Sequence, residues 1–454
     1  MTSSIAQRVS ECFIRPIHPI ENSNQICYLT GWDIAMSSMH YIQKGLLFKK
    51  PKTSPYNQQD FIENLLKNLK NSLSHALFYF YPLCGHLVTH KTQDPHSYTI
   101  FVDCSNNNPG ARFIYATAEV IISDILTPVD VPPIVETFFD LNKATNHDGH
   151  TIPLLSIQVT ELIDGVFIGC SVNHCIGDGT SFWNFFNIWS EIFQSQDYEN
   201  ENNIVLISRQ PFHNRWFPEG YGPPTNLPFK HHEEFISKYQ SPVFRDRFFH
   251  FTKEYIAKLK SKANKEFNTT KISSFQALSA HVWRCVTRAR QLTNNQKTSC
   301  KLAINNRSRM EPPLPKEYFG NAVDVISIET TVEELLQNNL GWAASKVNEV
   351  VANHDDKEVR KMLKEWLESP IVYQLGCHFD PNSITVSSSP RFNMYGNEFG
   401  MGKAIAVLSG YANKFDGNVS SYEGYEEGSI DLALTLMPDA MRALESDEEF
   451  MNVV

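Results

Sequence analysis

The sequence predicts a mixed α/β fold arranged as two domains. Apolar runs rich in β-branched residues alternate with amphipathic stretches of helical period, but without the strict strand–helix order of a doubly wound parallel sheet. At 454 residues the chain is too long for a single hydrophobic core. Its 42% hydrophobic content is sufficient for two well-packed domains.

The first half of the chain carries one long helix and one hairpin. Residues 59–80 place large apolar side chains at i, i+3, i+4 and i+7, which predicts an amphipathic helix that ends before Pro82. Asp164 and Gly165 form a dipeptide typical of tight hairpins. Apolar and β-branched runs predict strands at residues 12–17, 97–122, 154–162 and 166–172.

The second half alternates helix and strand patterns. Helices are expected at residues 252–265, 273–290, 331–353, 356–368 and from 438. Strands are expected at residues 248–251, 301–305, 384–387, 404–408 and 430–436.

A change of composition separates the two halves. Residues 194–229 are first polar and then rich in Pro and Gly, which favours an inter-domain crossover. We therefore expect an N-terminal domain of residues 1–193, a crossover linker of residues 194–229 and a C-terminal domain of residues 230–454.

Charge and composition disfavour several classes of partner. The net charge is −10 and no basic run occurs, so nucleic acid is not an expected partner. No window approaches the roughly 18 apolar residues of a membrane span, and residues 1–16 lack the apolar middle of a signal peptide. Nine cysteines without paired spacing suit a reducing compartment, which predicts a cytoplasmic protein.

One short segment, residues 173–179, joins a predicted strand to a predicted aromatic helix. His174 continues the alternation of the strand at residues 166–172, while Gly177 and Gly179 favour a tight turn. The imidazole therefore stands at the end of a buried strand, where a pocket can open. Because histidine titrates close to neutral pH, it is a natural general base.

The pattern His-x-x-x-Asp is weak evidence by itself. With 16 histidines, about one chance match is expected, and His90 with Asp94 provides a second one in a polar, turn-like run. Context therefore selects His174. The residues leave open a buried core histidine, a triad in which Asp178 orients the imidazole, and a metal site.

Local geometry ranks these alternatives. Neighbours on a strand face opposite sides, so a dyad of Cys175 with His174 is not expected. The glycines oppose the helix that would bring Asp178 beside His174, which favours a structural Asp178 paired with an arginine. No Gly-x-Ser-x-Gly nucleophile occurs. Direct deprotonation of a bound hydroxyl or amine, as in acyl transfer from an activated donor, is the simplest chemistry.

Five motifs then carry a family resemblance that runs nearly end to end. They are YPLCGHL (81–87), HCIGDG (174–179), ISSFQALSAHVWRCVTRAR (272–290), NRSRMEPPLPKEYFGN (306–321) and YGNEFGMGK (395–403). In this order and spacing, the chain resembles the plant BAHD acyl-CoA-dependent acyltransferases. It is similar to a subgroup of mostly uncharacterised members close to enzymes linked to cuticle and defence metabolism.

The resemblance implies a fold and an activity. Two similar domains like chloramphenicol acetyltransferase would enclose a channel, which CoA enters from one face and the acceptor from the other. The N-terminal domain would carry the HxxxD motif and the C-terminal domain the DFGWG-like motif. The reaction would move an acyl group from acyl-CoA, the co-substrate, to a hydroxyl or amine of a plant specialised metabolite. No permanently bound cofactor, metal, nucleic acid or membrane is implied, and a monomer is expected.

The resemblance also implies residue roles. His174 would be the general base, without a covalent intermediate, and Asp178 and Gly179 would support the site with Arg307 as the partner of Asp178. The candidates for the CoA side are Ser273, Ser274, Phe399, Gly400 and Gly402. The candidates for the acceptor pocket are Trp32, His40, Tyr41 and Ser388.

Three positions depart from the family pattern. Glu398 and Met401 replace Asp and Trp of the DFGWG motif, and Leu408 stands where many relatives of the subgroup carry arginine. These changes keep two alternatives open: a CoA-independent lyase or cyclase using the same His174 pocket, and a non-catalytic binding protein on this fold.

Overall fold

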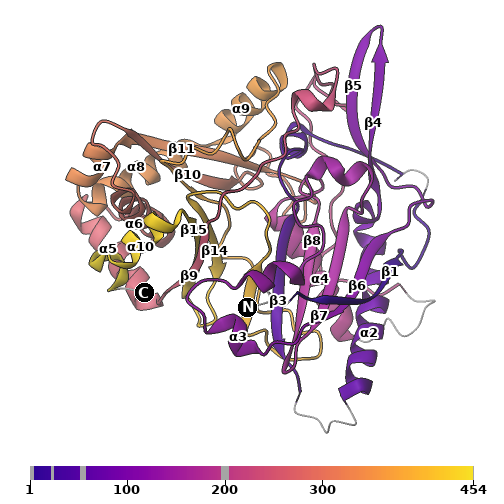
Figure 1. The fold of residues 1–454 in the computed structure, drawn as a ribbon. Helices are drawn as coiled ribbons and strands as arrows, with labels where there is room; N and C mark the ends of the chain where they lie inside the picture. Colours follow the sequence, from indigo (N-terminus) through magenta and orange to yellow (C-terminus); the bar gives the residue numbers. More distant parts are fainter. Residues whose placement is uncertain (1–4, 22–24, 52–57, 196–203, 453–454) are drawn as a thin grey trace.

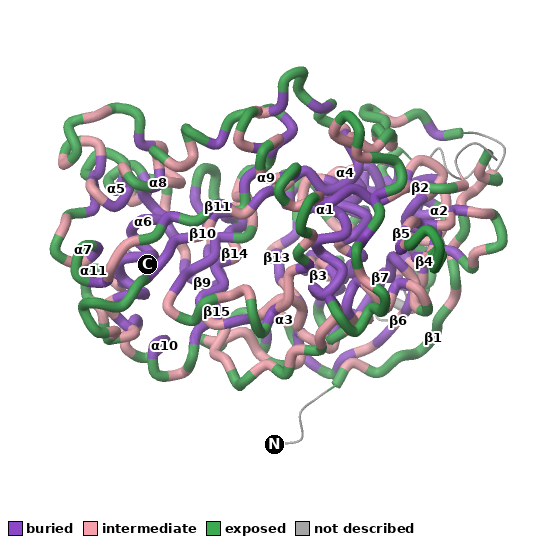
Figure 2. Tube along the Cα trace, turned by 90° about the horizontal axis from the view of Figure 1, so that it is seen from above, coloured by how far each residue is buried: buried purple, intermediate pink, exposed green. Residues whose placement is uncertain are grey.

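Two six-stranded sheets and a projecting three-stranded sheet organise the molecule (Figure 1). This computed structural model describes residues 5–21, 25–51, 58–195 and 204–452. Helices accompany both large sheets, so the architecture is mixed α/β, as the sequence predicts. Figure 2 shows that the buried residues concentrate in the strands of the two large sheets and in the helices packed against them.

The first large sheet is formed mostly by the first half of the chain. In spatial order its strands are β1 (Gln7–Ile14), β6 (Ala111–Thr117), β7 (Leu155–Glu161), β8 (Gly165–Val172), β3 (Ile42–Lys49) and β13 (Ala406–Ser409). β7 and β8 form the predicted antiparallel hairpin, with Val159 opposite Ile168. Every residue of β8 is buried, which places the segment after β8 at the end of a fully covered strand.

Two helices cover one face of this sheet. They are α2 (Gln58–Tyr79) and α4 (Gly179–Ser195). The aromatic stripe of α4 is buried, and Trp189 donates a hydrogen bond from Nε1 to Ser72 Oγ of α2 at 3.1 Å. The amphipathic period read from residues 59–80 therefore forms the predicted helix.

The second large sheet is formed by the second half of the chain. Its strands in spatial order are β11 (Val323–Thr331), β10 (Lys297–Asn305), β12 (Ile384–Val386), β14 (Asn418–Glu423), β15 (Ile430–Leu436) and β9 (Arg245–Phe251). The helices of this half are α5 (Lys253–Glu266), α6 (Ser274–Ala289), α7 (Val332–Gln337), α8 (Leu340–Asn353), α9 (Asp356–Glu368), α10 (Pro438–Glu445) and α11 (Glu448–Met451). All except α9 contribute residues to one core with this sheet.

Shorter elements complete the fold. The projecting sheet contains β2 (Ile26–Tyr28), β5 (His96–Asp103) and β4 (His86–Gln93). The short helices are α1 (Gly31–Ile34) and α3 (Ile122–Leu126), and the 3₁₀ turns are η3 (Tyr81–Cys84), η4 (Pro133–Phe138), η5 (Asn146–His150) and η7 (His232–Glu234).

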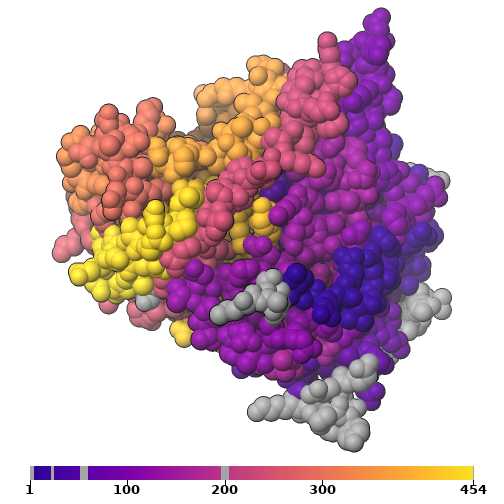
Figure 3. Space-filling model, viewed as in Figure 1, coloured from indigo at the N-terminus to yellow at the C-terminus, as the bar shows by residue number. Residues whose placement is uncertain are grey.

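The two halves of the chain interlock at β13. This strand comes from the second half, yet it pairs with β3 of the first sheet, with Val407 opposite Leu46. In Figure 3 the two halves pack against each other, and the segment between them runs over the surface. The predicted division at residues 194–229 stays a prediction, and β13 crosses it.

Several expected elements need correction. The predicted helix 331–353 is two helices, α7 and α8, separated at residues 338–339. The run at residues 90–94 belongs to the β4–β5 hairpin, because β4 continues to Gln93. Strands β2, β3, β4, β11 and β14 were not predicted. β3 is buried over most of its length, so its residues lack the polar alternation that marks a half-exposed strand.

Candidate active site

A cavity of about 720 Å³ lies between the two large sheets and is lined by His174. Lys44 of β3 and Ser409 of β13 reach it from the first sheet, whereas Lys301 of β10 and Tyr422 of β14 reach it from the second. His174 lies two residues after the end of β8 and is half-buried. The side chain singled out by the sequence therefore stands where both halves of the chain meet.

Hydrogen bonds to its backbone hold His174 in place. Its N–H donates to Asn146 Oδ1 at 2.7 Å, and its carbonyl oxygen accepts from Asn321 Nδ2 at 2.7 Å. The ring atom Nδ1 is buried and has no hydrogen-bond partner. Burial lowers the pKa of His174, and its own carbonyl group, Asp178 and Asn321 oppose that effect. The ring is thus neutral at neutral pH, the form that accepts a proton.

A buried carboxylate holds Asn321 in turn. Asp33 Oδ1 accepts from the backbone N–H and the side-chain Nδ2 of Asn321 at 3.0 and 2.9 Å. Asp33 Oδ2 accepts from the backbone N–H and hydroxyl of Thr30, and Arg215 Nε lies 3.6 Å away. Arg215 also donates from Nη2 to the Ile176 carbonyl at 2.8 Å. This network therefore holds residues 174–176, which follow β8, in place.

Sequence reasoning missed this network. Asp33 stands in an apolar and aromatic run. A single carboxylate in such a run is the one sequence signal of this network, because a buried charge requires partners. Arg215 lies in the expected linker, and nothing local indicates that it contacts Asp33. Asn321 closes one of the five motifs, but its partner is 288 residues away.

Asp178 and Arg307 form the ion pair that was expected. Arg307 Nη1 and Nη2 donate to the two carboxylate oxygens of Asp178 at 2.7 and 3.0 Å. The carboxylate also accepts from the backbone N–H groups of Ser181 and Ala322. Burial alone would raise the pKa of Asp178, but Arg307 and these donors bring it below its ordinary value. None of these bonds reaches the His174 ring.

The turn between β8 and α4 requires its small residues. A Cβ atom on Gly177 would lie 2.5 Å from Cβ of Ser181, so no larger residue fits without movement. Gly179 begins α4 and lines the cavity. The neighbouring Cys175 is buried, its Sγ lies 3.7 Å from Ser37 Oγ, and burial raises the pKa of its thiol. Cys175 therefore does not face the cavity beside His174.

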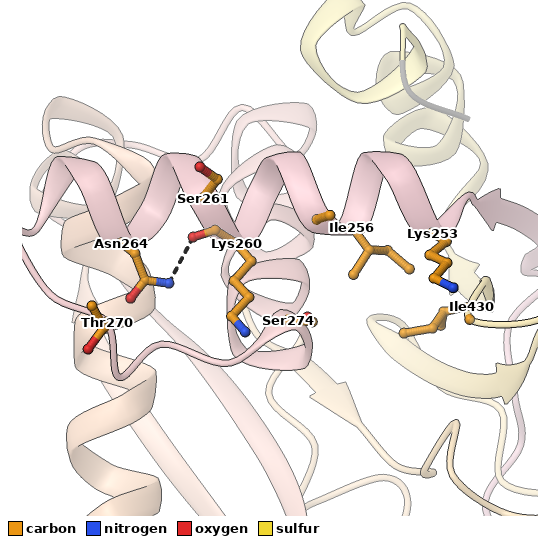
Figure 4. Close-up of a pocket in the computed structure, with 10 residues that line it drawn as sticks. Lys253, Ile256, Lys260, Ser261, Asn264, Thr270, Ser274 and Ile430 are labelled. Carbon is orange, nitrogen blue, oxygen red and sulfur yellow. Dashed lines mark hydrogen bonds between the residues drawn. The ribbon is translucent and has the colours of Figure 1, made fainter.

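The predicted CoA-side residues fall into two groups. Ser273 caps α6 and lines the cavity. Ser274 lines a separate pocket of about 700 Å³, together with Lys253 and Lys260 of α5. Figure 4 shows Lys260 extending from α5 toward Ser274. The beginning of α6 thus lies between the two spaces.

The glycine-rich turn at residues 398–402 lies apart from the cavity and from the pocket beside α5. Phe399 is fully buried, with its ring centroid 4.7 Å from that of Trp189 and 5.6 Å from that of Phe193. Phe399, Gly400 and Gly402 have φ values of 45°, 73° and 77°, so the turn is held in a left-handed conformation. None of the three lines either pocket, and the structure does not bring them to Ser273 or His174.

Only one of the four acceptor-pocket candidates reaches the cavity, and it is Ser388. Trp32 is buried and donates from Nε1 to Asp324 at 2.9 Å, and the Tyr41 hydroxyl donates to the Pro153 carbonyl at 3.1 Å. His40 accepts at Nδ1 from the backbone N–H of Asn413, and burial lowers its pKa to about 4. Their neighbours Met36, Met39 and Ile42 line the cavity instead.

The described residues contain neither a metal-holding cluster nor a membrane-crossing helix. Across residues 5–21, 25–51, 58–195 and 204–452, no group of three or more His, Cys, Asp or Glu is placed to hold a metal ion. Within the same ranges, no helix has the length and apolar character that a membrane crossing requires.

Known proteins match this chain over nearly its whole length. A family model described as "Transferase family" matches residues 8–451. An uncharacterised acetyltransferase of Arabidopsis thaliana is 36% identical over 451 residues, covering 98% of each chain. The BAHD acyltransferase DCR of the same plant is 30% identical, covering 98% of this chain and 92% of its own.

Solved structures show the same fold at low identity. Vinorine synthase has a TM-score of 0.73 at 21% identity, covering 99% of this chain and 98% of its own. TRI101 of F. sporotrichioides, solved with Coenzyme A and T-2, has a TM-score of 0.71 at 18% identity, covering 94% and 98%. The two-sheet architecture is therefore shared by proteins of very different sequence.

Proposed function

The chain belongs to the Transferase family, among the plant BAHD acyltransferases, and from this premise we propose that it transfers an acyl group from an acyl-CoA thioester to a hydroxyl or amine of a plant specialised metabolite. The observation that carries the proposal is His174. It is an imidazole kept neutral by burial, held by backbone hydrogen bonds, and placed on a cavity between the two sheets.

The geometry supports a direct transfer. Because Nδ1 of His174 is buried, Nε2 is the nitrogen accessible to substrate. Nε2 takes the acceptor proton while the oxygen or nitrogen bonds to the thioester carbonyl carbon. The carbon–sulfur bond then breaks, and the same proton passes to the departing CoA sulfur. General-base assistance of this kind contributes about 10²–10⁴ in rate, or roughly 3–5 kcal/mol of barrier.

The pocket beside α6 supports a place for CoA. Lys253 and Lys260 bring two positive charges to a pocket that Ser274, the first residue of α6, also lines. Helix N-termini and lysines both attract phosphate groups. TRI101 holds CoA and a small molecule on the same fold. CoA phosphates in this pocket and the thioester in the cavity beyond Ser273 are consistent with that precedent.

Phe399, Gly400 and Gly402 have a different part in this proposal. They act through the packing of their turn against α4 rather than by touching CoA. Ser388 remains the one predicted acceptor-pocket residue on the cavity. A cytoplasmic monomer without a resident cofactor remains our prediction.

Two measurements test the proposal. Calorimetric titration with CoA and a panel of acyl-CoAs is expected to show binding, and mass spectrometry of acyl-CoA and acceptor mixtures is expected to show an acylated product. His174→Ala should lower turnover by about 10²–10⁴. Cys175→Ser is the matched control, because its side chain contacts Ser37 and not the cavity.

Each failure has a defined meaning. A folded His174→Ala variant that keeps more than a tenth of wild-type turnover contradicts the role of His174. Absence of binding to CoA and to every acyl-CoA favours the lyase or cyclase alternative. Binding of CoA without any turnover across the panel favours a binding protein.

A further inference from the structure

The cavity is positively charged in a chain that is negative overall. The net charge of the protein is −10. The cavity lining nevertheless has five cationic side chains and two carboxylates. The cations are Lys44, Lys301, Arg309, Arg391 and Lys414, and the carboxylates are Asp178 and Asp246. This excess predicts an anionic ligand.

Both carboxylates already have cationic partners. Asp178 pairs with Arg307, and Asp246 Oδ2 lies 3.1 Å from Lys414 Nζ. Lys414 also lies 3.2 Å from Glu136, so its charge is compensated. Neither carboxylate is available to balance the other four cations of the lining.

Lys44 is a cation of the lining whose side-chain partners are neutral groups. It is half-buried on β3, and its Nζ donates to Ser409 Oγ at 2.7 Å and to the Tyr422 hydroxyl at 2.8 Å. The same ammonium lies 4.4 Å from the centroid of the Tyr422 ring. Among the described residues, no carboxylate lies within ion-pair distance of Lys44. Its partners are therefore neutral.

The ammonium group of Lys44 has one hydrogen-bond donor left for a ligand in the cavity. An ammonium group has three donors, and two of them are used. A half-buried charge without a counter-charge is unfavourable, which favours an anion supplied by a ligand. Ser409 and Tyr422 fix Lys44 from two different sheets, so the ammonium is held in place before a ligand arrives.

Strand register gives the distance to the base. Lys44 is opposite Cys170, and His174 follows four residues later along the direction of β8. At up to roughly 3.3 Å per residue, the two positions are at most about 13 Å apart along the chain direction, because His174 lies two residues beyond the end of β8. Both residues line the same cavity. A small substrate can therefore place one end at His174 and an anionic group at Lys44.

We propose that Lys44, positioned by Ser409 and Tyr422, binds a carboxylate of one of the two substrates. The ligand is then a hydroxy or amino acid as acceptor, or an acyl-CoA whose acyl group ends in a carboxylate. This inference rests on the proposed acyl transfer, but its central test measures binding and does not require turnover.

The experiment compares acids with their neutral analogues. Calorimetric titration would use 4-coumarate against methyl 4-coumarate, anthranilate against methyl anthranilate, and malonyl-CoA against propionyl-CoA. The wild-type protein is expected to bind the acid at least tenfold more tightly in one of these pairs. A preference within the first two pairs identifies the acceptor as the source of the carboxylate, and a preference within the third identifies the acyl group.

Variants then assign the preference to Lys44. Lys44→Met should reduce the acid-to-neutral ratio to near one without weakening the neutral analogue, whereas Lys44→Arg should retain most of the ratio. Equal affinity of the wild-type protein for both members of every pair overturns the proposal, as does equal loss of both ligands in Lys44→Met with an unchanged melting temperature. Since Lys44 bridges two sheets, Ser409→Ala is a milder second variant, expected to weaken acid binding selectively.

Discussion

Replacing Asp178 with Asn is expected to destabilise the protein as well as slow it. The pair with Arg307 is almost fully enclosed, with side-chain exposures of 2% and 5%. Removing one partner of a buried ion pair costs about 3–5 kcal/mol, because the remaining charge is left without compensation. Asn keeps one acceptor oxygen, so the cost lies toward 3 kcal/mol. At an unfolding entropy of about 2.1 cal/mol/K per residue, a chain of 454 residues shifts by about 1 °C per kcal/mol, so the melting temperature should fall by about 3 °C.

The assay is thermal unfolding followed by circular dichroism, with turnover measured on the same preparations. Arg307→Ala should reproduce the loss, since it leaves the Asp178 carboxylate unpaired. Lys297→Ala is the matched control: its ion pair with Glu329 is exposed, with side-chain exposures of 74% and 55%. Such surface pairs contribute about 0–1 kcal/mol. Wild-type stability in Asp178→Asn together with abolished activity would refute the structural role and favour a triad with His174.

Acid provides a second check on the same pair. The pKa of Asp178 is lower in the folded protein than in the unfolded chain, so the unfolded state binds the proton more readily. The stabilisation is present above the unfolded pKa and is lost as pH falls through the folded one. The difference in stability between wild type and Asp178→Asn should therefore shrink at strongly acidic pH. A constant difference would mean that the carboxylate charge is not what stabilises the fold.

Two further predictions concern the base and the glycine-rich turn. Because the pKa of His174 is lowered, kcat/KM should fall with acidity only at a pH below the ordinary histidine pKa. Asn321→Ala removes a group that raises this pKa, so it should move the fall to still lower pH and cut kcat about tenfold or more. A fall of kcat/KM above the ordinary histidine pKa, or at the same pH in the variant, would contradict this. Phe399→Ala should cost about 3–5 kcal/mol of stability, because the ring is fully buried. The Kd of the folded variant for CoA should stay within about threefold of the wild-type value. Selective loss of CoA affinity at wild-type stability would instead indicate that Phe399 contacts CoA directly.

The sequence was informative where the physical cause is local. The β7–β8 hairpin, α2 and α4 follow from turn chemistry and from apolar periodicity, which depend on neighbours a few residues apart. The pair of Asp178 with Arg307 was expected from a motif rather than from a pattern. Asp33 and Arg215 could not be foreseen, because their contacts join segments more than 180 residues apart and leave no periodic trace.

Motif membership was also a poor guide to position in the site. Phe399 belongs to the most characteristic turn of the family pattern, yet its side chain fills the core beside α4. Trp32 and Tyr41 lie in an aromatic run that could equally line a pocket, but each satisfies its polar group within the interior. Aromatic residues are favoured both in cores and in pockets, so composition cannot separate the two. Lys44, which does line the cavity, stands among apolar residues of a strand that was not predicted.

The position of His174 depends on both halves of the chain. The His174 carbonyl is bonded by Asn321, the Asp178 carboxylate by Arg307, and the Ile176 carbonyl by Arg215. β13 from the second half also completes the sheet that carries β8. Separating the halves would break these buried contacts at once, and the ion pair alone would cost about 3–5 kcal/mol. His174 is therefore held in place by buried contacts from both halves, and opening the contact between the halves would release it.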